Sequence, residues 1–199
     1  MDDPDDSAES ADGASLDEMM QHLGEAKKLD KSTLTSNQTQ WSGLQRKVRT
    51  QRNVAILSKN YSGRLDELVT REKITHRSGS RLVSAAAAFD AHGQLPIYYR
   101  TGDMVTHTGI ITDLILDPDP ESQKAEKFRS QVSEDDDYAD YNEELDTTTY
   151  IVEHGRKLDE PFQMTALRKV SDDEAIDEGF WRSPAYVYTR EGDFSSLGG

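Results

Sequence analysis

Apolar positions are sparse in the first 45 residues of the chain and gather into short runs after them. Apolar residues at helical spacing predict one helix over residues 16–29, after a capping box formed by Ser15 and Glu18. A polar linker follows up to about residue 45. We therefore expect residues 15–45 to be a helix and a linker, and the folded domain to begin at residue 46.

Within this domain the apolar pattern changes repeatedly between strand and helix. Residues 53–57 form a brief apolar run that predicts the first strand. Helical spacing follows over residues 62–74, whereas residues 81–89 fit a buried strand and the start of a helix equally well.

The clearest pattern is a β-hairpin over residues 95–116. Its two runs of β-branched and aromatic residues are separated by turn residues at 100–103. Gly109 lies inside the second run, where a glycine indicates a bulge or a close backbone approach. Further strands are predicted at 147–153 and 183–191, and residues 161–170 fit a strand or a short helix. Together these elements predict one α+β domain over 46–192.

Two segments are too acidic to be buried. Residues 1–14 predict a disordered acidic tail, and residues 121–146 predict a long solvated insertion, because dense like charge and few apolar groups oppose packing. Residues 193–199 are expected to form a loose tail.

The composition narrows the possible chemistry. The 199 residues are 34% hydrophobic and 31% charged and contain no cysteine, which excludes disulfides, thiolate metal sites and cysteine nucleophiles. Neither a basic, apolar leader nor a run long enough to span a membrane is present, so we expect a cytoplasmic protein with no membrane partner.

Net charge is −15, with Asp more common than Glu and Arg more common than Lys. An acidic surface poor in lysine resembles that of halophilic proteins from salt-loving archaea. An ordinary acidic protein with an acidic tail and loop remains the alternative, because net charge concerns solubility and partners rather than fold.

Positive charge is concentrated in residues 46–82, which hold ten Lys and Arg against three Asp and Glu. Such a segment is a candidate phosphate-facing surface, although its cations could equally pair with acidic groups of the fold. Arg77 and Arg81 flank a Ser-Gly-Ser sequence whose backbone could approach a phosphate. Arg49 and Arg52 are further candidates.

Catalytic and cofactor motifs are absent from the sequence. No glycine-rich phosphate loop, nucleophile elbow or dinucleotide fingerprint is found, and the five histidines lack metal-ligand spacing. We therefore expect no catalytic residues, no metal and no cofactor, although an enzyme is not excluded.

Aromatic residues supply the remaining binding candidates. Tyr98, Tyr99 and Trp181 could stack on bases, with Arg182 beside the tryptophan at the lip of a pocket. The alternative is that the tyrosines pack in the core.

The segment LPIYYRTGDMVTHTGIITDLIL resembles the central hairpin of PUA-like β-barrels, including the EVE group. The resemblance covers about residues 50–190 and implies a small mixed or antiparallel β-barrel with flanking helices. It also implies binding of RNA or of modified bases in DNA, through an aromatic pocket with a basic surround.

Three functions follow from these observations. The first is a non-catalytic nucleic-acid-binding module for RNA or modified-base DNA. The second is an adaptor whose acidic segments bind a basic protein partner, and the third is a subunit of a nucleic-acid-processing or defence enzyme.

Overall fold

The computed structural model describes residues 43–130, 145 and 147–194. The expected tail 1–14, the helix 16–29 and most of the insertion 121–146 lie outside the described residues. A helical segment over residues 43–50 opens the described part, within the region where the sequence indicates a linker and the domain start. Its Val48 side chain is fully buried.

Two strands and two helices come next. The apolar run after Asn53 forms β1, Val54–Lys59, and α2 follows at Ser62–Arg71. The helix ends earlier than its apolar spacing suggests, because Glu72 adopts a left-handed conformation with φ of 57°. The chain then continues as β2, Lys73–Ser78, which the sequence pattern does not reveal. The ambiguous run becomes α3, Val83–His92.

The predicted hairpin is confirmed as β3, Leu95–Thr101, and β4, Met104–Leu116. Gly109 is a site of close approach, since an added Cβ would lie 2.6 Å from Val152 Cγ1. The register against β5 also shifts between Thr108 and Ile110, so both interpretations of this glycine hold.

A short helix, α4, Gln123–Arg129, opens the acidic stretch. Ser122 caps it by accepting a hydrogen bond from the Ala125 N–H at 3.1 Å, and Phe128 is fully buried. Composition gave no sign of this helix, because its buried residues are few among many charges.

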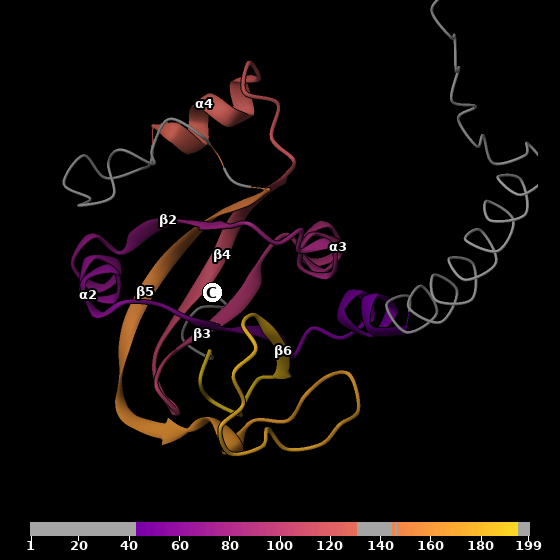
Figure 1. Cartoon of the computed structure of the whole chain (residues 1–199), viewed down its shortest axis with the longest axis vertical. Coiled ribbons are helices and arrows are strands. Elements are labelled where there is room, and N and C mark those ends of the chain that lie inside the picture. Colours follow the sequence, from indigo (N-terminus) through magenta and orange to yellow (C-terminus); the bar gives the residue numbers. More distant parts are fainter. Residues whose placement is uncertain (1–42, 131–144, 146, 195–199) are drawn as a thin grey trace, which may run out of the picture. The chain divides into compact units, whose positions relative to one another are not determined.

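The remaining elements are β5, Thr148–Gln163, the 3₁₀ helix η2, Met164–Ala166, and β6, Ala185–Tyr188. Strands order as β2-β5-β4-β3-β1-β6, with β1 parallel to β3 and every other neighbouring pair antiparallel. The mixed sheet with helices agrees with the expected α+β class. The expected barrel is wrong: β2 and β6 occupy opposite ends of the sheet order, so the sheet is open (Figure 1).

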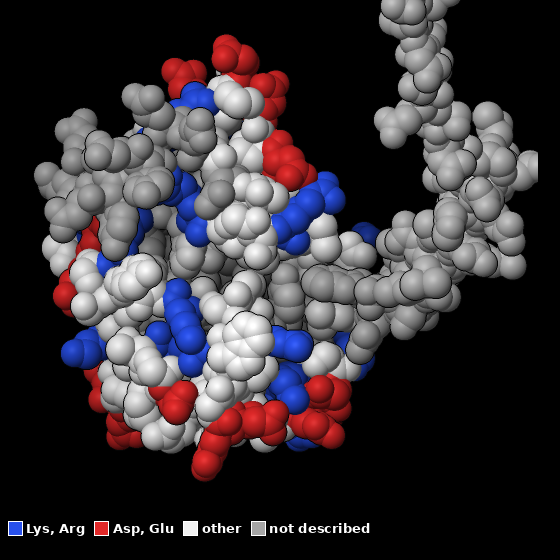
Figure 2. All heavy atoms as spheres, viewed as in Figure 1, with Lys and Arg blue, Asp and Glu red and all other residues white. Residues whose placement is uncertain are grey.

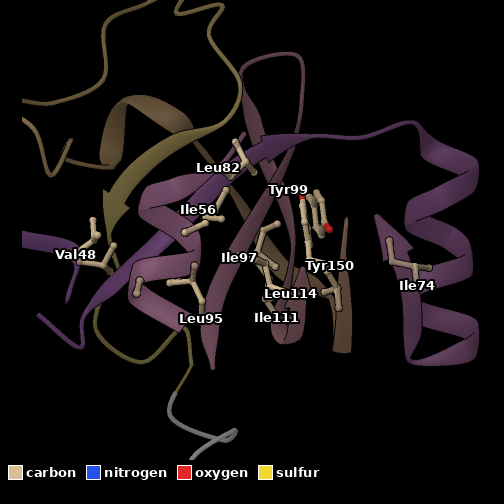
Figure 3. Packing of buried hydrophobic residues seen from close by; sticks show 14 of the residues in the cluster. Val48, Ile56, Ile74, Leu82, Leu95, Ile97, Tyr99, Ile111, Leu114 and Tyr150 are labelled. Atoms are coloured by element: carbon tan, nitrogen blue, oxygen red, sulfur yellow. The ribbon is translucent and has the colours of Figure 1, made fainter. Parts of the chain in front are cut away.

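Two apolar layers cover this sheet. On one face α2 packs on β2 and β5, and α3 packs on β3 and β4 (Figure 1). Figure 3 shows this cluster running from Val48 past Ile56 and Ile97 to Ile74 beside α2. The opposite face is covered by residues from η2 onward, including Leu167 and Ile176.

Gly155 sets the distance between α2 and the sheet. An added Cβ there would lie 2.8 Å from the carbonyl oxygen of Leu68, a contact closer than van der Waals packing allows. The helix therefore packs directly on the β5 backbone at this point.

Candidate nucleic-acid interface

The two tyrosines proposed from sequence as base-stacking residues are core residues. Tyr98 and Tyr99 are both fully buried, on opposite faces of β3. The Tyr98 hydroxyl donates to Asp193 Oδ2 at 2.6 Å and accepts from the Arg190 N–H at 3.0 Å. Their rings are thus unavailable for stacking, which corrects the sequence-based assignment. The reason is that both faces of the sheet are covered at these two positions.

Asp193 also places the start of the C-terminal tail. Its bond to Tyr98 and the contact of Phe194 with the Tyr98 ring, at a centroid distance of 5.0 Å, hold these residues against the sheet. The tail expected over 193–199 therefore begins with two packed residues, and 195–199 lie outside the described part.

The loop between Arg77 and Arg81 is held by hydrogen bonds from its backbone N–H groups to nearby hydroxyl groups. The Ser80 N–H donates to Ser78 Oγ at 3.2 Å, and the Leu82 N–H donates to Thr148 Oγ1 at 3.0 Å. The Arg81 Nε lies 2.5 Å from Asp117 Oδ2 in an exposed ion pair. Exposed pairs of this kind contribute little free energy, so Asp117 holds Arg81 only weakly.

Trp181 and Arg182 are exposed, as the sequence-based hypothesis requires. Trp181 is 75% exposed, and the Arg182 guanidinium lies 5.9 Å from its ring centroid. A flat ring in water with a cation against it offers a stacking surface and a charge together.

The loop that carries Trp181 is attached to the carboxyl end of β1. Ser183 Oγ accepts a hydrogen bond from the Lys59 N–H at 3.1 Å and lies 3.4 Å from Ser58 Oγ. Residues 124 positions apart in sequence therefore meet at this edge. The Lys59 side chain is exposed there.

Tyr61 is the second aromatic residue at the same edge, and sequence reasoning missed it. It is 73% exposed, two residues after Lys59, as Trp181 is two residues before Ser183. Because two residues span at most about 7 Å, both rings start close to the bond between Lys59 and Ser183. Among the described residues the one further exposed large hydrophobic side chain is Val69, at 39%. The signal in the sequence was an aromatic residue inside a polar turn between a strand and a helix.

Tyr61 is also the N-cap residue of α2. No side chain caps this helix, and its first turn contains no acidic residue. The first N–H groups of a helix lack intrahelical acceptors and carry partial positive charge. The edge therefore combines two exposed rings, the cations Lys59 and Arg182, and a helix end that favours an anion. We call this set, with Ser183, the aromatic edge.

A buried arginine supports the loop from below. Arg100 is 2% exposed and pairs in register with Lys59 across β1 and β3. Its guanidinium donates to the Gly102 carbonyl and to the Phe180 carbonyl, each at 2.8 Å, while Nε has no partner among the described residues. The residue before Trp181 is thus held by a buried charge, so the loop is positioned rather than merely exposed.

A ring stack near the aromatic edge is formed by two buried tyrosines and by His76, which is partly buried. The His76 ring stacks on Tyr150 at 4.7 Å and on Tyr99 at 5.9 Å between centroids, and Figure 3 shows the two tyrosines side by side in the core. Burial lowers the pKa of His76 to about 4, and the nearby Arg64 guanidinium acts in the same direction. The imidazole is therefore neutral near pH 7 and has a structural part in the core.

Charge is unevenly distributed on the surface. In Figure 2 the Lys and Arg side chains gather over the middle of the viewed face, whereas Asp and Glu lie mainly toward its upper and lower margins. A protein of net charge −15 thus presents positive charge locally, which is what contact with a polyanion requires.

Arg49 and Arg52 lie apart from the aromatic edge. Arg49 belongs to the helical segment 43–50 and Arg52 follows it, and both are exposed. The structure therefore divides the eight candidates into buried tyrosines, two separate basic regions, and the pair Trp181 and Arg182.

No grouping of three metal-ligating side chains is found within residues 43–130 and 147–194. None of the helices in the described part of the chain combines the length and apolar character needed to cross a membrane.

No protein-family model and no curated protein sequence matches this chain. In structure, it is similar to the N-terminal domain of Staphylothermus marinus McrB, with 14% sequence identity and a TM-score of 0.41. The similarity covers 72% of this chain and 92% of that domain.

Proposed function

We propose that the protein is a non-catalytic module that binds unpaired bases of nucleic acid, in RNA or in DNA carrying a modified base, at the aromatic edge. The observation that carries this proposal is that the segments bearing Tyr61 and Trp181, the two most exposed large hydrophobic side chains described, are joined by the bond between Lys59 and Ser183. Exposed rings cost free energy in water, and base stacking recovers it.

Charge supports the same ligand. Lys59 and Arg182 flank the rings, and the uncapped start of α2 favours an anion, so a base stacked at the edge would bring its phosphate toward positive potential. Arg77 and Arg81 are proposed as further phosphate contacts on the same strand of nucleic acid. Substituting both should flatten the dependence of binding on salt.

Stacking is tested by removing the Trp181 ring. A labelled 12-nucleotide single strand is titrated with the parent and with Trp181→Ala, and fluorescence anisotropy gives the dissociation constant. Loss of one stacked base costs about 1–3 kcal/mol, so we expect binding at least fivefold weaker. Trp181→Phe should retain most of the affinity because it keeps a ring.

The matched control is Val69→Ala, which trims an exposed apolar side chain toward the other end of α2. It should bind as the parent does. Equal affinity of the parent and Trp181→Ala would show that the aromatic edge does not stack bases. Comparing RNA, DNA and DNA with a modified base then identifies the preferred ligand.

A further inference from the structure

A second basic surface lies on the helical segment 43–50. Arg46 and Arg49 are exposed on it, and Arg52 lies two residues beyond its end. The inner side of the segment is firmly held, since Val48 is fully buried and Lys47 Nζ donates to the carbonyls of Val170 and Ser171 at 3.0 and 2.9 Å. The outer arginines therefore project from a fixed support.

Among the residues that the structure describes, these arginines have no acidic partner, whereas neighbouring cations do. Arg71, Lys73 and Arg81, from the same basic stretch of sequence, each pair with a carboxylate. Arg46 and Arg49 form no ion pair with any residue of the described ranges, including Asp90 on adjacent α3. Residues three apart on a helix have Cβ atoms about 5–6 Å apart, so two arginines at this spacing repel each other through their charges. A bound anion would offset this repulsion.

The surface is hollowed at this point. An open pocket of about 440 Å³ is lined by the two arginines together with Gln45, Thr50 and Ala91 of α3. Its volume falls in the range of small-ligand sites. Guanidinium, amide and hydroxyl groups are donors suited to phosphate oxygens, and arginine binds phosphate in a bidentate manner.

We propose that this pocket is a phosphate-binding site, distinct from the aromatic edge, and that it holds the sugar–phosphate backbone of the bound nucleic acid. The source of the phosphate rests on the proposed function. The pocket-bearing helix precedes β1, whereas the aromatic edge lies at its far end, and six residues of strand span about 16 Å. The two sites thus contact different parts of one ligand, bases at one and phosphates at the other.

An abasic oligomer separates the two contacts because it carries phosphates without bases. The full-length chain is titrated with a labelled abasic 12-mer and, separately, with inorganic pyrophosphate, as parent and as the double variant Arg46→Gln, Arg49→Gln. For the abasic probe we expect at least tenfold weaker binding at low salt. The slope of log affinity against log salt should fall by about 1.4, since a single strand contributes about 0.7 for each lost contact.

The control variant Lys124→Gln, Lys127→Gln makes the same change in net charge on α4 and should bind the abasic probe as the parent does; melting temperatures verify folding. Loss of pyrophosphate binding in the arginine variant without loss of oligomer binding would support the site but assign it to a small phosphorylated ligand. The inference would be overturned if the arginine variant bound each probe as tightly as the parent does. It would also be overturned if the control variant weakened binding as much as the arginine variant, or if the parent bound neither probe. The proposed function has its own test: it fails if Trp181→Ala binds a base-containing single strand as tightly as the parent does.

Discussion

The hydroxyl of Ser183 accepts a hydrogen bond from the backbone N–H of Lys59 at 3.1 Å and so joins the Trp181 loop to the end of β1. This bond extends the pairing of β1 with β6, in which Leu57 lies opposite Ala185, and it brings the segments that carry Tyr61 and Trp181 to one edge. Its removal has a measurable consequence.

Ser183→Ala should lower the free energy of unfolding by about 1 kcal/mol, the usual net contribution of one hydrogen bond. It should also weaken binding of a single-stranded oligonucleotide, because the loop beside Trp181 loses its side-chain bonds to the end of β1. Urea denaturation and anisotropy measure the two effects. Thr70→Ala removes a hydroxyl that bonds to a carbonyl of its own helix and is the control; oligonucleotide affinity unchanged by Ser183→Ala would contradict the positioning role.

Arg100→Lys tests the support beneath the loop. Lysine keeps the charge, but its single ammonium group lacks the planar fork that reaches both the Gly102 and Phe180 carbonyls. We expect a loss of about 2 kcal/mol in unfolding free energy, since bonds to charged groups are worth about 1.5–3 kcal/mol. Oligonucleotide binding should weaken while its salt slope stays constant, because Arg100 is buried and contacts no phosphate. A reduced slope would instead assign it a direct contact.

His76 should make the fold sensitive to mild acid. The unfolded imidazole binds a proton near pH 6.5, whereas in the folded protein burial lowers the pKa to about 4. Stability from this group is therefore complete above pH 6.5 and falls as the pH falls toward 4. Between pH 6.5 and 5 the loss is about 2 kcal/mol, at about 1.4 kcal/mol per pH unit.

Denaturation curves at these two pH values measure this loss, and His76→Phe is the comparison because it keeps a ring in the stack without a titrating group. The difference between parent and variant isolates His76 from the other histidines. An identical fall in stability for both proteins would show that the histidine takes up its proton normally in the folded state.

Gly155→Ala should disturb the packing of α2 on β5. The added methyl would collide with Leu68 of the helix, and overpacking of this kind costs about 1–3 kcal/mol. Gly63→Ala is the matched control, because nothing lies within 4 Å of its added Cβ. It should stabilise the helix by about 0.5–1 kcal/mol, the propensity difference between the two residues. Thermal or chemical unfolding distinguishes the opposite signs, and equal effects would mean that α2 does not pack against Gly155.

Local patterns in the sequence were sufficient for several elements. The hairpin of β3 and β4 has β-branched runs around turn residues, and the apolar run of β1 and the alternation in β6 are equally local. Strand β2 was not predicted, because the helical spacing of apolar residues continues through Ile74, whereas the helix ends at Glu72. The burial of Phe128 in α4 was not predicted, because the sequence from 117 to 146 is rich in carboxylates.

The function-bearing surface was less accessible to sequence. Trp181 and Arg182 were identified from their adjacency alone, and their exposure fits that hypothesis. Tyr98 and Tyr99 carry the same chemistry but lie in the core, because both faces of this sheet are covered, so alternation along β3 does not distinguish solvent from interior.

The sequence by itself determined the apolar runs, the turns and the concentration of positive charge, since each depends on neighbouring residues. Only the tertiary structure decided that Lys59 meets Ser183, that Arg46 and Arg49 border a pocket, and that Arg81 pairs with Asp117. The physical reason is that these relationships depend on which strands pair and on which face each helix packs, and both are set by the whole chain burying its apolar surface at once.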